Sequence, residues 1–100
     1  ENHPKVAMLY NSIAKDLAKR GNQNAALDLS SKAVKIQLMN SREDHPDLAK
    51  IYITMADLLK TQSKYHDAAE FCDKALAIRS KVFGEGHPFV DELLQKRSEL

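Results

Sequence analysis

The chain contains 100 residues, of which 43% are hydrophobic and 29% are charged, and its formal net charge at pH 7 is +1. This composition suits a single soluble domain, and no apolar run approaches the roughly 20 residues that a membrane-spanning helix needs. Basic and acidic residues are evenly divided along the sequence, so no basic stripe calls for nucleic acid or an anionic membrane as a partner.

The first part of the chain predicts two helices, residues 4–19 and 24–39. Pro4 suits the first helical position, because its missing N–H would be unpaired there anyway. The sequence around Gly21 interrupts the helical pattern with a residue that can take a positive φ, and residues 40–44 read as a polar loop. Apolar residues of the first helix recur at steps of three and four, which is the spacing of one helical face: Val6, Leu9, Tyr10, Ile13, Ala14 and Leu17.

The second part of the chain repeats this plan, with helices predicted at residues 46–61 and 66–82. The turn between these helices lacks a glycine, which costs little if Ser63 keeps a negative φ. A glycine-bearing stop after residue 82 ends the second pair, and a fifth helix is predicted to begin at Pro88. Because Arg97 is a poor core residue unless it is paired, we expect this last helix either to act as a polar cap or to fray beyond Leu94.

A shift of 42 residues superposes the chain on itself without a gap. The dipeptide His3-Pro4 falls on His45-Pro46, and that dipeptide falls on His87-Pro88. A fixed period of this length is the signature of a solenoid, in which each unit buries its apolar face against its neighbours. The shift pairs Ala7 with Ala49, Tyr10 with Tyr52, Ala14 with Ala56, Leu17 with Leu59, Ala26 with Ala68, Lys32 with Lys74, Ala33 with Ala75 and Ile36 with Ile78.

The repeat predicts an all-α fold of about five antiparallel helices in the order A-B-A-B-A, with no strand. Residues 1–44 form the first repeat, residues 45–86 the second, and residues 87–100 the first helix of a third or capping repeat. Because the third unit stops after one helix, we expect the chain to be part of a longer array. The small residues repeated at Ala26, Ala33, Ala68 and Ala75 allow the close approach that crossing helices need.

This pattern of large, aliphatic and small residues resembles the tetratricopeptide repeat. Along the first helix of each pair the slots are filled by Tyr10, Ile13, Ala14 and Leu17, and again by Tyr52, Met55, Ala56 and Leu59. The 42-residue period, the His-Pro opening and the ending Ala-Ile-Arg-Ser-Lys-Val-Phe-Gly-Glu-Gly-His-Pro are similar to the subtype found in kinesin light chains. The resemblance implies a right-handed α-solenoid that binds proteins without catalysing a reaction, as an adaptor or cargo-binding scaffold.

Residues that carry chemistry elsewhere have simpler interpretations here. One metal ion could not reach two histidines of the set His3, His45 and His87, because a helix separates equivalent atoms of successive repeats; each histidine reads instead as a helix N-cap. Cys72 reads as a small buried hydrophobe rather than a nucleophile. His66 lies beside Asp67 with no nucleophile placed near them. We therefore expect no enzyme activity, no cofactor and no metal site.

The resemblance also implies where a partner would bind, since the A helices of such arrays line the concave groove. Lysines in this groove would favour a peptide with acidic residues, although Asp57 would repel an anion at its position and puts in doubt the clamping of a carboxylate. The groove residues expected on this basis are Met8, Asn11, Ser12, Lys15, Lys19, Lys50, Ile53, Thr54, Asp57 and Lys60, followed in the last helix by Glu92, Gln95 and Lys96.

An alternative function is structural self-assembly. An incomplete array leaves an apolar edge that could stack on another copy and form a homo-oligomer, and the candidates for that edge are Phe89, Val90, Leu93 and Leu94. For location, the single cysteine excludes an internal disulfide and no signal peptide is recognised, so a reducing compartment fits. We expect a cytoplasmic protein, and the resemblance to kinesin light chains adds an association with the cytoskeleton.

Overall fold

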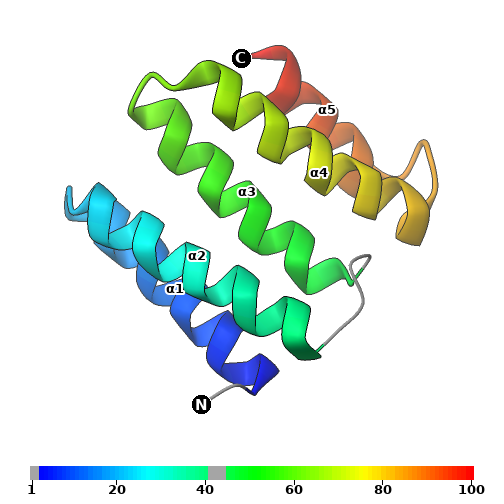
Figure 1. The fold of residues 1–100 in the computed structure, drawn as a ribbon. Helices are drawn as coiled ribbons and strands as arrows, with labels where there is room; N and C mark the ends of the chain where they lie inside the picture. Colours follow the sequence, from blue (N-terminus) through cyan, green and yellow to red (C-terminus); the bar gives the residue numbers. More distant parts are fainter. Residues whose placement is uncertain (1–2, 41–44) are drawn as a thin grey trace.

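The computed structural model describes residues 3–40 and 45–100, which form five α-helices and, within these ranges, no strand. The predicted all-α succession is therefore confirmed. The boundaries of the first four helices, and the start of the fifth, lie within one residue of their expected places. Asn40 belongs to a helix rather than to the predicted loop, and the rest of that loop lies outside the described residues. The helices are α1 (Pro4–Lys19), α2 (Gln23–Asn40), α3 (Pro46–Thr61), α4 (Tyr65–Phe83) and α5 (Pro88–Ser98) (Figure 1).

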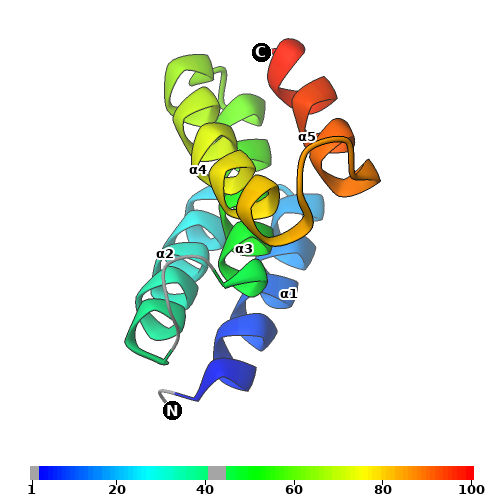
Figure 2. The ribbon, with the colours of Figure 1, turned by 90° about the vertical axis from the view of Figure 1, so that its right-hand side faces the viewer.

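The helices form two layers. Helices α1 and α2 form one antiparallel pair and α3 and α4 the next, and α3 lies between α2 and α4 in Figure 1. Seen from the side, α2 and α4 lie on one side of the molecule and α1 and α5 on the other (Figure 2). Below, α1, α3 and α5 are called A helices and α2 and α4 are called B helices.

All three A helices begin in the same way, because each is capped by the histidine that precedes its first proline. The Nδ1 atoms of His3, His45 and His87 accept a hydrogen bond, each 3.1 Å long, from the backbone N–H two residues later. This bond satisfies a donor that the helix leaves unpaired at its first turn. The N-cap interpretation of the periodic histidines is confirmed.

Small residues lie where the A and B helices cross, as predicted. The alanines Ala26 and Ala33 of α2, and Ala68 and Ala75 of α4, are completely buried. At these positions α2 and α4 contribute only a methyl group, which permits a close approach of paired helices. The small residues expected at the crossings are thus buried in both repeats.

The repeats are joined by the packing of α3 on α2. Ile51 of α3 is completely buried in a cluster with Ala33 and Ile36 of α2. The residues of α1 in the register of Ile51 and its neighbour Met55 are Leu9 and Ile13, and their side chains are 57% and 37% exposed. They are exposed because no described helix covers this face of α1, although they belong to the predicted apolar stripe.

The turn inside each repeat has the same geometry, and the expectation for Ser63 is wrong. Gly21 has a φ of 88° and Ser63 a φ of 64°. In both turns the next residue donates its N–H back to the helix, from Asn22 to Leu17 O at 2.8 Å and from Lys64 to Leu59 O at 2.9 Å. This is the Schellman motif, which requires a left-handed residue at the position that Gly21 and Ser63 occupy.

The last helix, α5, runs to Ser98, so the expected fraying beyond Leu94 is not observed. Arg97 is only partly exposed, and its Nε donates a 2.9 Å hydrogen bond to Oδ1 of Asp73 in α4. On another side of α5, Asp91 and Ser98 stand at slots where the earlier A helices carry buried alanines. The alternative expectation, that α5 acts as a polar cap, agrees with this exposed polar face.

The expected self-association edge on α5 needs correction. Val90 and Leu93 are 3% and 0% exposed, because this face of α5 packs on α4 as α3 packs on α2. Leu93 belongs to the same buried cluster as Ala75 and Ile78 of α4. Of the four candidates, Phe89 and Leu94 remain on the surface, at 48% and 50% exposure.

Candidate functional site

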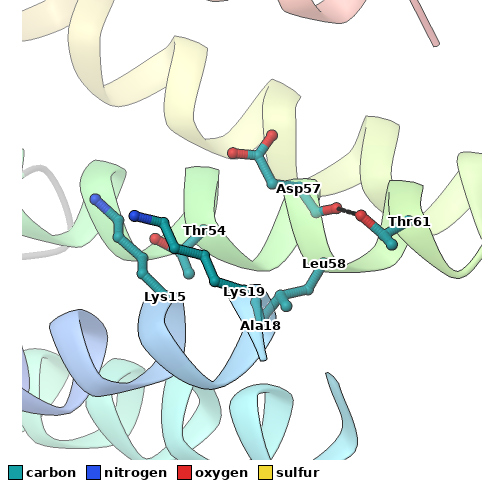
Figure 3. A pocket seen from close by; sticks show the side chains of 7 residues that line it. All are labelled: Lys15, Ala18, Lys19, Thr54, Asp57, Leu58 and Thr61. Atoms are coloured by element: carbon teal, nitrogen blue, oxygen red, sulfur yellow. Dashed lines mark hydrogen bonds between the residues drawn. The ribbon is translucent and has the colours of Figure 1, made fainter. Parts of the chain in front are cut away.

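A depression lies between two neighbouring A helices, α1 and α3, and is called here the A-helix groove. Its volume is about 220 Å³. Ala18 and Leu58 give it an apolar floor, since Leu58 packs in a buried cluster that also includes Ala18 at its edge. The groove is lined by Lys15, Ala18 and Lys19 from α1 and by Thr54, Asp57, Leu58 and Thr61 from α3 (Figure 3).

Helical spacing explains why these side chains share one surface. Lys15 and Lys19 are four residues apart, and Thr54 and Thr61 are seven apart, so each pair projects from one face of its helix. Where α1 and α3 run past each other, the two faces meet. The groove is therefore built on rigid helices rather than on loops.

The lysines of the groove lack ion-pair partners among the described residues, whereas its aspartate has one. Lys15 and Lys19 are exposed, and neither forms an ion pair with a described residue. Asp57, in contrast, accepts hydrogen bonds from Nζ of Lys96 in α5, at 3.3 Å to Oδ1 and 3.2 Å to Oδ2. In Figure 3 the ammonium groups of the two lysines lie on the same side of the groove, and the Asp57 carboxylate points elsewhere. Because Asp57 has its own cation, its repulsion of an anionic partner is weaker than the sequence implies.

The hydroxyl groups of the groove leave acceptors for a partner. Oγ1 of Thr54 donates to the carbonyl oxygen of Lys50 at 3.2 Å, and Oγ1 of Thr61 donates to that of Asp57 at 2.9 Å. Each hydroxyl proton is thus used within α3, and the oxygen lone pairs remain. The groove can therefore offer two cations, two hydroxyl acceptors and an apolar floor.

The structure brings together four of the expected groove residues and separates the others from them. Lys15, Lys19, Thr54 and Asp57 line the A-helix groove. Lys60 lies in a smaller depression of about 130 Å³ beside α5, which Asp57 also lines. Ala18, Leu58 and Thr61 line the A-helix groove although they were not expected there. The remaining expected residues do not line it: Met8, Asn11, Ser12, Lys50, Ile53, Glu92, Gln95 and Lys96. The spacing of Thr61 from Thr54 is a signal that could have identified it.

The expected exposure of Asn11 and Thr54 is wrong. Their side chains are 3% and 4% exposed, because α1 and α3 pack against each other along this face. Thr54 still reaches the groove, but Oδ1 of Asn11 is buried without a hydrogen-bond partner among the described residues. A buried acceptor left unpaired costs about 1–3 kcal/mol of stability.

The arrangement offers binding groups rather than reactive ones. Cys72 is buried, and burial, with a smaller contribution from the nearby Asp57 carboxylate, raises the pKa of its thiol. A protonated thiol is a poor nucleophile. In the part of the chain that the structure describes, no cluster of three or more histidine, cysteine or acidic side chains is placed to hold a metal ion.

Comparison with known proteins agrees with the helical repeat. The family model described as tetratricopeptide repeat matches residues 6–47 and again residues 48–89. None of the curated proteins compared with the chain matches it. Across the described residues, none of the helices has the length and apolar character needed to cross a bilayer.

Proposed function

Because the chain belongs to the tetratricopeptide repeat family, we propose that its A-helix groove binds a peptide segment that carries acidic residues and belongs to another protein. Repeats of this family generally mediate interactions between proteins. The observation that carries the proposal is the pair Lys15 and Lys19, two exposed cations without a described ion-pair partner beside an apolar floor. A peptide carboxylate on this side of the groove would find opposite charge.

The charges alone give limited affinity. An exposed ion pair contributes about 0.2–1 kcal/mol, so two lysines together supply roughly a factor of 2 to 30 in affinity. The peptide must also place an apolar side chain on the floor made by Ala18 and Leu58, since buried apolar anchors usually dominate recognition. We infer a segment with one apolar anchor and acidic residues on the α1 side of the groove.

The finer proposal concerns the role of the chain in the cell. We propose that it acts as an adaptor or cargo-binding scaffold of the kinesin light chain type, in the cytoplasm and in association with the cytoskeleton. Support comes from the 42-residue register and from the His-Pro dipeptide that opens each A helix.

The experiment measures peptide binding by fluorescence anisotropy at two salt concentrations. The probes are labelled peptides of about twelve residues with one central leucine or tryptophan and acidic residues at varied spacing. The variant Lys15→Glu/Lys19→Glu is compared with Lys5→Glu/Lys64→Glu, which makes the same change of net charge at exposed lysines outside the groove. The proposal expects weaker binding only for the first variant, with a larger loss at low salt.

Equal binding by the two variants would refute the proposal, provided that both keep the helical circular dichroism spectrum of the wild type. A loss of binding shared by both variants would show a non-specific charge effect, and would also count against the groove.

A further inference from the structure

A second depression lies on the opposite layer of the molecule, between the two B helices. It is called here the B-helix furrow, and its volume is about 300 Å³. No Cα atom of α2 comes within 8 Å of one in α4, because α3 separates the two helices (Figure 1). Side chains of α3 therefore form the floor of the furrow, and α2 and α4 form its walls.

The furrow is mainly apolar. Tyr52 and Met55 of α3 lie at its floor, Val34 and Leu38 of α2 form one wall, and Phe71 of α4 forms the other. Leu38 is 41% exposed, and Val34, Tyr52 and Phe71 are half-buried. The ring centroids of Tyr52 and Phe71 are 5.7 Å apart, which gives the furrow an aromatic surface.

Lysines supply all the charge that lines the furrow. Lys35 stands on the α2 wall and Lys74 on the α4 wall, and no acidic residue lines the depression. The Nζ atom of Lys74 lies 5.6 Å from the centre of the Tyr52 ring and 5.1 Å from that of Phe71. Neither lysine forms an ion pair with a residue that the structure describes.

The nearest carboxylates on α4 do not neutralise these lysines. Glu70 lies one turn before Lys74, but its carboxylate is 3.4 Å from Nε2 of His66. Asp73, next to Lys74, accepts the hydrogen bond from Arg97 of α5. The furrow thus keeps two cations on opposite sides of an apolar surface.

The internal repeat indicates that two residues of the α2 wall are not required by the scaffold. The 42-residue register places Lys35 on Ala77 and Leu38 on Ser80. The buried slots nearby keep their character in both repeats, as Ala33 and Ala75 do. An exposed leucine and a lysine on the α2 wall are therefore additions to the scaffold rather than parts of its core.

We propose that the B-helix furrow binds an amphipathic helix of another protein, with an apolar stripe flanked by acidic residues. The stripe would cover the aromatic and aliphatic surface, and the acidic residues would reach Lys35 and Lys74. A helix fits better than an extended segment, because the walls of the furrow are helices and offer no strand edge to pair with a peptide backbone. The inference is independent of the A-helix groove, which lies on the other layer.

The test is a titration of the protein with a synthetic helix, followed by amide chemical shifts and by anisotropy. The probe is a capped peptide of about fourteen residues with leucines at i, i+3, i+4 and i+7 and glutamates beside them. One control peptide has the same composition in scrambled order, and another replaces every glutamate with lysine. We expect binding of the first peptide only, with shift changes centred on Tyr52, Phe71 and Leu38.

The decisive variant is Lys35→Ala/Leu38→Ser, which gives the α2 wall the residues that α4 carries at the same slots. It should keep the melting behaviour of the wild type and bind the probe about tenfold more weakly or worse. The variant Lys15→Glu/Lys19→Glu should bind the probe as the wild type does.

Four results would overturn the proposal: no binding at millimolar peptide, equal binding of either control peptide, full affinity of the folded Lys35→Ala/Leu38→Ser variant, or loss of binding in the A-helix groove variant.

Discussion

Replacing Ser63 by glycine should stabilise the protein, because Ser63 occupies a left-handed position at φ 64° that glycine takes without strain. A left-handed conformation costs a residue with a Cβ atom about 1–2 kcal/mol. Glycine also loses more backbone entropy on folding than serine does. This loss offsets about 0.5–1 kcal/mol of the stability gained by relieving the strain. At the midpoints of these two ranges, the expected net increase in the free energy of unfolding is about 0.8 kcal/mol.

The reciprocal change tests the same reasoning with the opposite sign. Gly21 holds the equivalent position at φ 88°, and a Cβ atom added there would meet nothing within 4 Å. Gly21→Ser therefore adds conformational strain without a clash, and it should destabilise the protein by about the amount that Ser63→Gly gains.

The assay is thermal and urea unfolding followed by circular dichroism. For a domain of this size, 1 kcal/mol corresponds to about 4–8 °C in melting temperature, so the two variants should shift it by about 3–6 °C in opposite directions. Ser31→Gly, in the middle of α2, is the control and should lower stability by about 0.5 kcal/mol, since glycine is a poor helix former. The reasoning is refuted if Ser63→Gly is neutral or destabilising while Gly21→Ser leaves stability unchanged.

Three further substitutions test the packing, the capping and the buried polar group. Ala75→Leu should cost about 1–3 kcal/mol or more, because it overpacks a completely buried helix crossing, whereas Ala77→Leu on the exposed face of α4 should be nearly neutral in the same urea titration. His45→Ala should lower the free energy of unfolding by about 0.5–2 kcal/mol, because α3 loses its N-cap. His45→Asp should restore most of this stability, and melting temperatures measure both changes. Asn11→Leu should raise the free energy of unfolding by about 1 kcal/mol, because it removes the buried unpaired Oδ1; a lower value would mean that the site cannot accept the branched side chain.

The helices could be predicted from the sequence because each repeat contains its own signals for helix starts and helix crossings. Pro46 and Pro88 mark the first turns, and the alanines at 42-residue spacing mark the crossings. These signals are local or periodic, so they need no knowledge of the neighbouring helix. The 42-residue register then extends each signal from one repeat to the next.

The environment of single side chains was harder to predict, because it depends on which helix lies opposite. Periodicity places Asn11 and Thr54 on one face of their helices, but only the contact of α1 with α3 buries them. Val90 and Leu93 were expected near an open edge. A hydrophobic residue in the sequence does not indicate whether the preceding helix covers its side chain. The positive φ of Ser63 escaped prediction because the turn geometry, not the residue type, imposes it.

The contacts of charged side chains between helices also could not be predicted from the sequence. The ion pair of Asp57 with Lys96 joins residues 39 apart, which the 42-residue register does not pair. It changes the expected electrostatics of the A-helix groove, because Asp57 is a neutralised residue rather than a free anion. The three-dimensional structure is needed to see that Lys96 of α5 contacts the carboxylate of Asp57 in α3.

The attachment of α5 has a consequence for hydrogen exchange. This helix is held by the buried Val90 and Leu93 and by ion pairs that are mostly exposed. Three of them involve residues of the helix itself, Arg97 with Asp73, Lys96 with Asp57 and Glu92 with Arg79, and a fourth joins its C-cap Glu99 to Lys60. Exposed pairs weaken as salt rises, while the alanine-lined crossings of the two full repeats do not depend on charge. The amides of α5 should thus open as a separate unit ahead of the rest of the chain, and each opening leaves Asp57, which lines the groove, without its Lys96 partner. Ionic strength thereby sets how often the groove carries a free negative charge.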